Sequence, residues 1–259
     1  VVKFVEEVKA RAKEQLVLPE GKTPAGELAR YKRFLKAEAI RLKKLHRSGG
    51  LGREVCAARA AVIDTLLQHL LRAALDLAPL GKFKKEPSIA VIALGGYGRA
   101  ELNPHSDVDI QFLCEDRLLN DTQPHVFLKS ITDTMLYTLW DVGLKIGHSV
   151  RRVRDCVQEA NKDMQSKTAL IEARCVAGDE VLFEKMEKAV HTKCVKPYFD
   201  EYIAARLEDQ AVRRAKHGNA VTMQEPDIKN GCGGLRDYQN ICWLMHFKLG
   251  YRSVEDLEG

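Results

Sequence analysis

The sequence predicts an α+β fold in which a small mixed β-sheet core is flanked by N-terminal and C-terminal helical regions. Apolar residues recur at helical spacing before residue 85 and again after residue 179, whereas short β-rich runs lie between these regions. The hydrophobic fraction of 45% and the charged fraction of 30% are ordinary for a globular protein of 259 residues. We divide the chain into regions 1–84, 85–179 and 180–259, and expect them to form one compact unit.

Three helices are predicted in the N-terminal region. Charged and apolar residues alternate at helical spacing up to Gln15, and turn-forming Pro and Gly residues follow. An amphipathic stripe then predicts a second helix, and its apolar members are Leu28, Tyr31, Leu35, Leu42 and Leu45. A third helix has a broad apolar face from Val55 to Ala74 and ends near Pro79.

The central region follows a β-α-β-α-β pattern. Its three strands are predicted at residues 89–94, 108–114 and 144–153, with helices opening near residue 97 and spanning 126–142. Residues 116–124 are rich in turn formers and predict a loop. Helical or mixed structure is expected at residues 154–161 and 168–176, and longer helices at 180–194 and 198–217.

Composition excludes several classes of protein. The net charge of +5 is spread without a long basic block, so nucleic acid is not expected as a partner. No window approaches the ~18–20 consecutive apolar residues that a transmembrane helix needs, and the start of the chain lacks a signal-peptide core and an initiator methionine, as expected of a fragment. The seven cysteines form no CxxC pair, so Cys56, Cys156 and Cys175 are interpreted as core thiols of a reducing cytosol rather than zinc ligands.

The candidate chemistry lies in IAVIALGGYGRAELNPHSDVDIQFLC, residues 89–114. Side chains alternate between the two faces of a strand, so Asp107 and Asp109 share one face while the apolar residues beside them point to the other. Two carboxylates separated by roughly 6–7 Å of strand can share divalent cations, which would in turn hold a nucleoside triphosphate. Gly95 and Gly96 lack a Cβ, so backbone amides there can approach phosphate oxygens closely.

The string GGYGRAELNPHSDVDI resembles the signature of DNA polymerase β-type nucleotidyltransferases, and within them it is most similar to the bacterial PII uridylyltransferase/uridylyl-removing enzymes. Three later blocks resemble that family in its own order: TLWDVGLKIGHSVR, TALIEARCVAGDEVLF and EPDIKNGCGGLRDYQNICWL. The resemblance covers roughly residues 24–250. Ala100, Gln111 and Cys232 depart from the family's common glycine, aliphatic residue and proline, which bears on loop geometry rather than on the metal site.

The resemblance implies a nucleotidyltransferase core with Asp107 and Asp109 as catalytic metal ligands for Mg²⁺, or for Mn²⁺ in its place. A third carboxylate is normal in this superfamily. Glu172 is the first choice because acid-x-Arg resembles the third-acid block of related adenylyltransferases, with an ion pair to Arg174 as the alternative reading. Asp227 is the second choice for the third carboxylate.

The same resemblance implies that Gly95, Gly96 and Ser106 hold the β- and γ-phosphates of the nucleotide. Arg99 would assist them, or it would form a salt bridge with Glu101 that holds the turn. The two readings of Arg99 are left open at this point.

Four further positions are weaker candidates for the site. His148 could reach a phosphate or carry a proton, although a buried, hydrogen-bonded histidine is the favoured reading. The glycine cluster at residues 231–234 could be a second phosphate loop with Lys229 and Arg236 beside it, or a helix-start turn with Asp237 near the helix N-terminus. Asp227 stands just before that cluster.

The function that the resemblance implies is cytoplasmic transfer of UMP from UTP to a tyrosine of the PII signal protein, a part of nitrogen regulation. The alternatives are an adenylyl- or other nucleotidyltransferase with a different protein or RNA acceptor, and a catalytically inactive regulatory module of the same fold. The family normally continues into an HD hydrolase domain and glutamine-sensing ACT domains, and neither fits in the residues after Leu249. Removal of the uridylyl group and glutamine sensing are therefore expected to be absent from this piece.

Overall fold

The computed structural model describes residues 2–120, 124–220, 222 and 224–251. The chain groups into two compact units. We name as the sheet unit the residues up to Cys156 together with Glu172–Met186, and as the helical unit Val157–Ile171 together with the described residues from Glu187 onward. The predicted regions 1–84, 85–179 and 180–259 stay a prediction, whereas these two units combine stretches that are interleaved along the chain.

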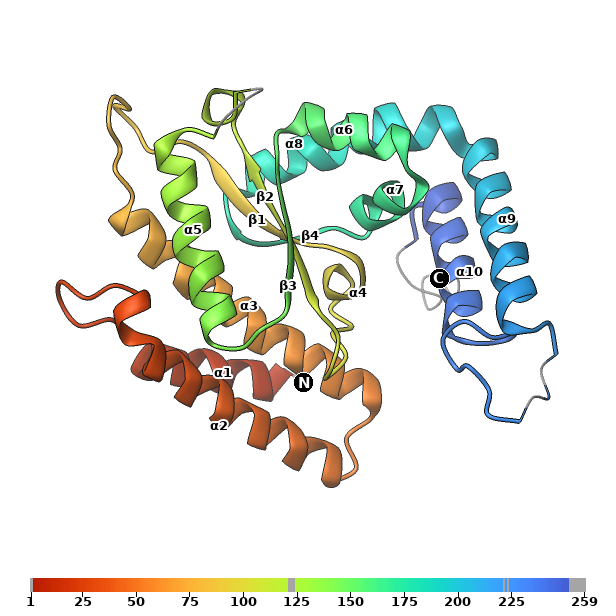
Figure 1. The fold of residues 1–259 in the computed structure, drawn as a ribbon, viewed down its shortest axis with the longest axis horizontal. Coiled ribbons are helices and arrows are strands. Elements are labelled where there is room, and N and C mark those ends of the chain that lie inside the picture. Colours follow the sequence, from red (N-terminus) through yellow and green to blue (C-terminus); the bar gives the residue numbers. More distant parts are fainter. Residues whose placement is uncertain (1, 121–123, 221, 223, 252–259) are drawn as a thin grey trace. The chain divides into compact units, whose positions relative to one another are not determined.

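The sheet unit contains a four-stranded mixed sheet in the order β3-β2-β1-β4 (Figure 1). Its strands are β1 Ile89–Ala93, β2 Val108–Cys114, β3 Ile146–Arg151 and β4 Arg174–Gly178. Strand β1 pairs antiparallel with β2 and β4, whereas β2 and β3 are parallel. The predicted α+β class and mixed sheet are confirmed, and the first three strands lie where the sequence predicts them.

Strand β4 differs from the expectation of a helical or mixed segment at residues 168–176. Helix α7, Met164–Ile171, ends inside that segment, and β4 begins at Arg174. Residues 168–176 therefore contain the end of helix α7 and the start of strand β4. Only the pairing of β4 with β1 identifies the strand.

Among the described residues, five helices lie wholly within this unit, which also contains the first residues of two more. They are α1 Val2–Gln15, α2 Leu28–Arg47, α3 Gly52–Leu77, the short α4 Gly95–Gly98 and α5 Val126–Asp141. Helix α3 packs against α1, α2, α5 and β4, and Figure 1 shows α1 and α2 beside it. Helix α4 follows β1 and α5 follows β2, so the predicted β-α-β-α-β order is confirmed.

One hydrophobic core joins these helices to a single face of the sheet. It contains Val91 of β1, Phe112 of β2, Leu66 and Leu70 of α3, and Phe127 of α5, all of them fully buried. Burying an apolar side chain of this size is worth about 1.5–3 kcal/mol. The alternation of β2 therefore turns Ile110 and Phe112 toward this core and Asp109 toward the opposite face, where Gln111 and Leu113 further along the strand are also buried.

The buried face of α2 includes a charged residue. Tyr31 and Phe34 are in the core, and the Glu38 side chain beside them is 0% exposed. Its carboxylate accepts hydrogen bonds from Arg11 Nε at 2.7 Å and from Arg41 Nη1 at 2.9 Å. A buried carboxylate is tolerated only when it is paired in this way, so Glu38 links α1 to α2.

The remaining helices are α6 Val153–Lys162, α7, α8 Glu180–Val190, α9 Phe199–His217 and α10 Leu235–Leu249. Helix α8 is shorter than the predicted 180–194, and a π-helical turn His191–Val195 and a 3-10 turn Lys196–Tyr198 follow it. Pro197 lies in that second turn and cannot donate a backbone hydrogen bond, so the regular helix does not continue into α9.

The core of the helical unit is aromatic. The rings of Tyr202 on α9 and Phe247 on α10 are stacked, with centroids 4.0 Å apart. The guanidinium carbon of Arg206 lies 4.4 Å from the ring centroid of Trp243. Stacked aromatic and cation–π contacts of this kind stabilise the pairing of the two helices. Among the described helices, none combines the length and the apolar character needed to cross a membrane.

Two predicted segments are described only in part. The predicted loop 116–124 begins with a 3-10 turn, Asp116–Leu118, and its residues 121–123 lie outside the described residues. The described residues also exclude three parts of the predicted C-terminal region: residue 221, residue 223 and residues 252–259. A 3-10 turn at Ala25–Glu27 leads into α2.

Candidate active site

Asp107 and Asp109 lie at the start of β2, on the face of the strand opposite to the hydrophobic core. Both aspartates are exposed, whereas Val108 and Ile110 are each 1% exposed and belong to the hydrophobic core. The alternation of the strand therefore places the two carboxylates on the polar face, as predicted. In the register of the sheet, Asp109 stands opposite Gly147 of β3.

The electrostatics of this pair suit a divalent cation. Burial, together with the neighbouring negative charge of Asp107, raises the pKa of the Asp109 carboxyl. Adjacent carboxylates repel each other unless a cation lies between them, and carboxylate oxygens are the ligands that Mg²⁺ prefers. In the part of the chain that the structure describes, no group of three or more His, Cys, Asp or Glu side chains is placed to hold a metal.

Gly147 makes room for the Asp109 carboxylate. A Cβ built on Gly147 would collide with Asp109 Oδ1. The carboxylate thus lies directly over the backbone of the neighbouring strand, where only glycine leaves enough space. Gly147 positions one of the two candidate metal ligands, a role that the sequence alone did not reveal.

The glycine turn after β1 forms the short helix α4. Gly95 has a φ of +55°, a conformation that glycine adopts without strain. A Cβ on Gly98 would lie 3.1 Å from the Ala93 carbonyl oxygen and would collide with the carbonyl oxygen of Glu172. The turn is therefore packed against the segment that leads into β4. The phosphate contacts predicted for Gly95 and Gly96 stay a prediction.

Arg99 lies directly after the turn and binds two carboxylates. Its Nε donates to Glu101 at 2.7 Å and its Nη1 donates to Glu172 at 2.6 Å. Burial alone would lower the pKa of the Arg99 guanidinium, but the two carboxylates raise it. The salt bridge with Glu101 is therefore present, and it occurs together with a second one to Glu172. A role of Arg99 in nucleotide binding stays a prediction.

Glu172 has Arg99 as its ion-pair partner in the structure, while Arg174 pairs with Asp64. The Glu172 side chain is 8% exposed, so it is far more enclosed than Asp107 or Asp109. It is joined to the glycine turn through Arg99, and its assignment as the third catalytic carboxylate stays a prediction. Sequence reasoning considered Arg174 as its partner because the two residues are close in the chain.

Asp64 on α3 is a residue that sequence reasoning missed. Its carboxylate accepts hydrogen bonds from Tyr97 Oη at 2.7 Å and from Arg174 Nη1 at 2.8 Å and Nη2 at 3.0 Å. Arg174 also donates to the carbonyl oxygens of Tyr97 and Gly98, both at 3.3 Å. Asp64 and Arg174 thereby tie α3, α4 and β4 together around the turn. The sequence signal that could have revealed Asp64 is its position as a single carboxylate within the apolar run AAVIDTLL.

Burial and the Asp64 carboxylate raise the pKa of the Tyr97 hydroxyl well above its ordinary range. Tyr97 is 2% exposed, so its hydroxyl remains a neutral donor to Asp64 at any ordinary pH. Its ring fills the core beneath the turn. Tyr97 is therefore part of the support of the site rather than a group that contacts substrate.

Ser106 lies in the exposed loop before Asp107 and has local contacts. Its hydroxyl donates to the carbonyl oxygen of Asn103 at 3.0 Å, and its own carbonyl oxygen accepts from Arg59 Nη2 at 3.3 Å. Arg59 belongs to α3, and burial lowers the pKa of its guanidinium. The predicted phosphate contact of Ser106 stays a prediction, and Arg59 is a second neighbour of the site that sequence reasoning missed.

His148 is exposed, so the favoured reading of it as a buried histidine is wrong. Its ring lies edge-on to Trp140 of α5, with centroids 5.7 Å apart. In the register of the sheet, His148 stands opposite Ile110 rather than Asp109. Its side chain therefore emerges on the face opposite to the aspartates, and the structure does not bring it to them.

Asp227 and Lys229 belong to the helical unit. Asp227 accepts the backbone N–H groups of Lys229 at 3.0 Å and Asn230 at 2.8 Å, and its carboxylate lies 3.2 Å from His217 Nδ1. These bonds close an Asx turn before the glycine cluster. The hydrogen bonds from Asn230 and Lys229 lower the pKa of Asp227 although burial acts in the opposite direction. Its assignment as the alternative third carboxylate stays a prediction.

The glycine cluster at residues 231–234 opens α10, with Asp237 in the first helical turn, as the helix-start reading predicts. Asp237 accepts from the Gly233 N–H at 2.9 Å and from Arg213 Nη1 at 3.1 Å. Arg236 donates from Nη1 to Gln239 at 2.8 Å, and its guanidinium lies 5.6 Å from the Trp243 ring centroid. Contacts of Arg236 and Lys229 with nucleotide or acceptor stay predictions.

Two family models match this chain. The model described as glutamate-ammonia ligase adenylyltransferase matches residues 7–140, which include β1, β2 and both aspartates. The model described as GlnD PII-uridylyltransferase matches residues 201–259. The first match covers the stretch in which the geometry places the candidate site.

Curated relatives carry the name bifunctional uridylyltransferase/uridylyl-removing enzyme. The protein of Cereibacter sphaeroides is 38% identical over 188 residues, which is 72% of this chain and 20% of the relative. That of Azospirillum brasilense is 37% identical over 169 residues, 65% of this chain and 18% of the relative. That of Pseudomonas fluorescens strain Pf-5 is 34% identical over 235 residues, 91% of this chain and 25% of the relative. The chain thus spans a quarter or less of the length of these relatives.

Proposed function

Since the chain belongs to the nucleotidyltransferase family of the bifunctional uridylyltransferase/uridylyl-removing enzymes, we propose that it transfers UMP from UTP to a tyrosine of the PII signal protein. The observation that carries the proposal is the pair Asp107 and Asp109, exposed together at the start of β2 on the face opposite to the hydrophobic core. In the proposed reaction the tyrosine oxygen attacks the α-phosphorus, the bond from that phosphorus to the bridging oxygen breaks, and pyrophosphate leaves.

The residues of the chain supply positioning in this reaction. Asp107 and Asp109 would hold Mg²⁺, or Mn²⁺ in its place, which would neutralise the charge that develops on the phosphate oxygens. Gly147 leaves space for the Asp109 carboxylate, and Asp64 with Arg174 holds the glycine turn on the sheet. Gly95 and Gly96 would present backbone amides to the β- and γ-phosphates, with Ser106 and Arg99 beside them.

The proposed acceptor is supported by the family, and the proposed compartment is supported by the cysteines. PII is proposed as the acceptor because the matching family model is described as a PII-uridylyltransferase and the relatives are named for uridylyl transfer. We propose a cytoplasmic location, which is supported by the seven cysteines, all of them free thiols of the kind found in reducing compartments. We expect no nucleic-acid partner, given the modest net charge of +5.

Adenylyl transfer is the second candidate function. It is favoured by one observation: the adenylyltransferase family model matches the stretch that contains Asp107 and Asp109. An inactive regulatory module is a weaker candidate, because a module that only binds has no need of two adjacent carboxylates that repel each other. Competition between nucleoside triphosphates distinguishes the first two functions.

The test is intact-mass analysis of a PII protein incubated with this chain, Mg²⁺ and each of the four nucleoside triphosphates in turn. A gain of one UMP per subunit, seen with UTP and lost in Asp107→Asn, is the expected result. Asp141→Asn is the matched control, because Asp141 is an exposed carboxylate at the end of α5 and does not belong to the candidate site.

Other outcomes of the same assay would change the proposal. Transfer with ATP alone would replace UTP as the donor and keep the nucleotidyltransferase activity. Mg²⁺-dependent nucleotide binding without transfer would show that PII is the wrong acceptor, or that transfer requires further domains of the longer relatives. Neither transfer nor binding would favour the inactive module.

A further inference from the structure

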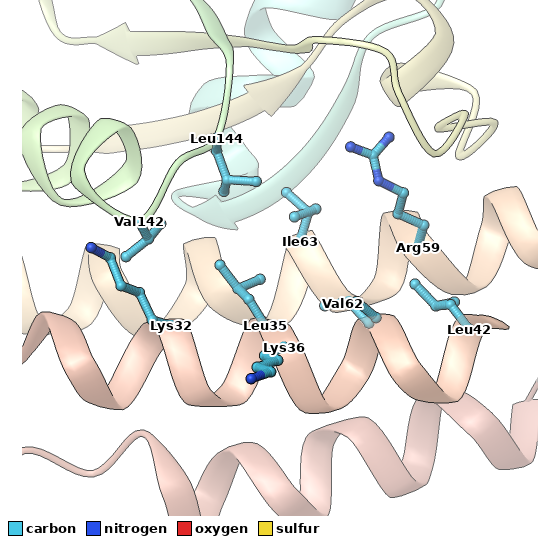
Figure 2. Close-up of a pocket in the computed structure, with 10 residues that line it drawn as sticks. Lys32, Leu35, Lys36, Leu42, Arg59, Val62, Ile63, Val142 and Leu144 are labelled. Atoms are coloured by element: carbon cyan, nitrogen blue, oxygen red, sulfur yellow. The ribbon is translucent and has the colours of Figure 1, made fainter. Parts of the chain in front are cut away.

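A pocket of about 360 Å³ lies between α2, α3 and the turn that joins α5 to β3 (Figure 2). Its walls are largely aliphatic and include Leu35, Val62, Ile63 and Leu144. Leu35 belongs to the apolar stripe predicted for α2, yet it remains only half-buried because Tyr31 and Phe34 occupy the core side of that helix. The protein's own side chains therefore leave part of this apolar surface uncovered.

The charged residues that line the pocket are all cationic. Lys32 and Lys36 project from α2, Arg59 lies on α3, and no Asp or Glu is among the residues that line it. Ile63 follows Arg59 by one helical turn, and Figure 2 shows both rising from the same side of α3. The pocket therefore combines an apolar wall with a positive electrostatic potential.

Arg59, which lines the pocket, has a side-chain nitrogen without a hydrogen-bond partner among the described residues. Its Nη1 is buried and has no hydrogen-bond partner among the described residues, while its Nη2 donates to the Ser106 carbonyl oxygen at 3.3 Å. An unpaired buried donor destabilises a protein by about 1–3 kcal/mol. An anion beside Arg59 would remove that cost, and a carboxylate can accept two parallel hydrogen bonds from the planar guanidinium.

We propose that this pocket binds a small organic acid, with its carboxylate on Arg59 and its aliphatic body against Leu35, Val62, Ile63 and Leu144. The volume suits such a ligand, because small-molecule pockets begin at about 300 Å³. A neutral apolar ligand would leave the Arg59 donor unpaired. A larger polyanion would place some of its charged groups against the aliphatic wall, which is unfavourable. A small carboxylate satisfies both the donor and the wall.

The site is connected to the candidate active site through the backbone. Arg59 donates to the carbonyl of Ser106, and the next residue in the chain is Asp107. A carboxylate that pairs with Arg59 changes the position of its guanidinium, so the loop before Asp107 responds to binding. The ligand site is separate from the phosphate positions proposed above, and its existence does not depend on the proposed transfer reaction.

The test is NMR titration of the whole chain, without nucleotide, carrying ¹⁵N amides and ¹³C-labelled Ile, Leu and Val methyl groups. The probes are straight-chain carboxylates from butyrate to octanoate, with the primary alcohol of the same length as the uncharged control. We expect saturable shifts of the Leu35, Val62, Ile63 and Leu144 methyl signals and of the Ser106 and Asp107 amides. The alcohols should bind at least about tenfold more weakly, the change that the loss of one charged hydrogen bond produces.

Two variants make the assignment specific. Arg59→Gln should weaken carboxylate binding at least about tenfold, whereas Arg72→Gln, an exposed arginine on the same helix that does not line this pocket, should leave it unchanged. Leu35→Phe fills the pocket and should abolish binding even if Arg59→Gln fails to fold. Shifts that do not saturate, or saturable shifts that neither Arg59→Gln nor Leu35→Phe alters, would overturn the proposal.

Discussion

At the scale of single residues, the contact between Gly147 and Asp109 decides whether a candidate metal ligand can keep its position. A Cβ at residue 147 would collide with Asp109 Oδ1, although Gly147 does not have a positive φ. We therefore expect Gly147→Ala to fold and to move the carboxylate. A misplacement near 1 Å costs about 10²-fold in rate, and the mass assay of UMP transfer measures that loss.

Gly52→Ala is the matched control for this variant, because a Cβ at Gly52 would meet no atom within 4 Å. The control should keep full transfer activity and the same melting temperature. If Gly147→Ala keeps the activity of the control, the Asp109 carboxylate does not need the position that the structure shows.

Glu172 raises a different question at the same scale, because one residue is both an ion-pair partner and the predicted third carboxylate. Glu172→Gln retains the shape of the side chain and a hydrogen-bond acceptor for Arg99, which also keeps its bond to Glu101. We expect transfer to fall by about tenfold or more, equivalent to about 1.4 kcal/mol in the barrier. Initial rates at saturating UTP are the measurement.

The thermal unfolding of the same variant separates the two roles of Glu172. A lower melting temperature with normal transfer would identify the residue as structural only and would favour Asp227 as the third carboxylate. Loss of transfer with an unchanged melting temperature would support the catalytic assignment.

At the scale of secondary-structure elements, the Asp64 carboxylate is the point where α3, α4 and β4 meet. It is bound by Tyr97 and Arg174, and its side chain is only 21% exposed. Removing one partner of such a group leaves the others unpaired, which costs about 2–4 kcal/mol. We expect Asp64→Ala to lower the free energy of unfolding by that amount in urea titrations.

Asp76→Ala on the same helix is the comparison, because Asp76 is exposed. It should change the free energy of unfolding by less than about 0.5 kcal/mol. An equal effect of the two substitutions would mean that the hydrogen bonds of Asp64 do not stabilise the protein.

The start of α10 has a pH-dependent contribution to stability. Burial acts to raise the pKa of Asp237, but hydrogen bonds from Gly233, Gln210 and Arg213 lower it to about 2. The folded state therefore favours the ionised carboxylate. The contribution of the Asp237 charge to the free energy of unfolding is complete above the ordinary carboxyl pKa of 3.8 and is lost as the pH falls through about 2.

Asp237→Asn tests this contribution. With an allowance for solvent screening, we expect it to lower the free energy of unfolding by about 1–2 kcal/mol at pH 7. The difference in the free energy of unfolding between the variant and the parent protein should become smaller as the pH falls from 5 toward 2. Urea unfolding followed by circular dichroism measures this difference. A gap that stays constant over this range would show that the Asp237 charge is not what stabilises the turn.

At the scale of the whole molecule, the reactivity of the buried cysteines reports the unfolding of each of the two units separately. Burial raises the pKa of Cys114 to about 12 and that of Cys156 to about 11, and Cys194 is also buried with a raised pKa. Of the predicted core thiols, Cys156 is buried, whereas Cys56 and Cys175 are partly exposed. Thiolate is the reactive form, so the three buried cysteines should resist alkylation in the folded protein.

Iodoacetamide labelling at pH 8 in increasing urea, with peptide mass analysis, measures this protection. Cys114 and Cys156 should become reactive at one urea midpoint because both belong to the sheet unit, and Cys194 reports the midpoint of the helical unit. Fast labelling of Cys114 or Cys156 without urea, or different midpoints for the two, would contradict a single cooperative sheet unit.

The sequence by itself determined the mixed sheet around the Gly95–Gly96 turn and the common face of Asp107 and Asp109. Those features follow from local periodicity, because the alternation of a strand and the breaking of a helix depend on neighbouring residues. The helix start at Asp237 was predictable for the same reason, since its signals lie within a few positions of one another.

Only the tertiary structure decided which charges pair around the site and which aliphatic residues remain uncovered. Arg99 and Glu172 are 73 positions apart in the chain, and Asp64 and Arg174 are 110 apart. Nothing in a local pattern selects such partners over the nearer choice of Arg174 for Glu172. The exposure of His148, the strand β4 and the pocket at Arg59 likewise depend on how distant elements pack, because burial is a property of the assembled core.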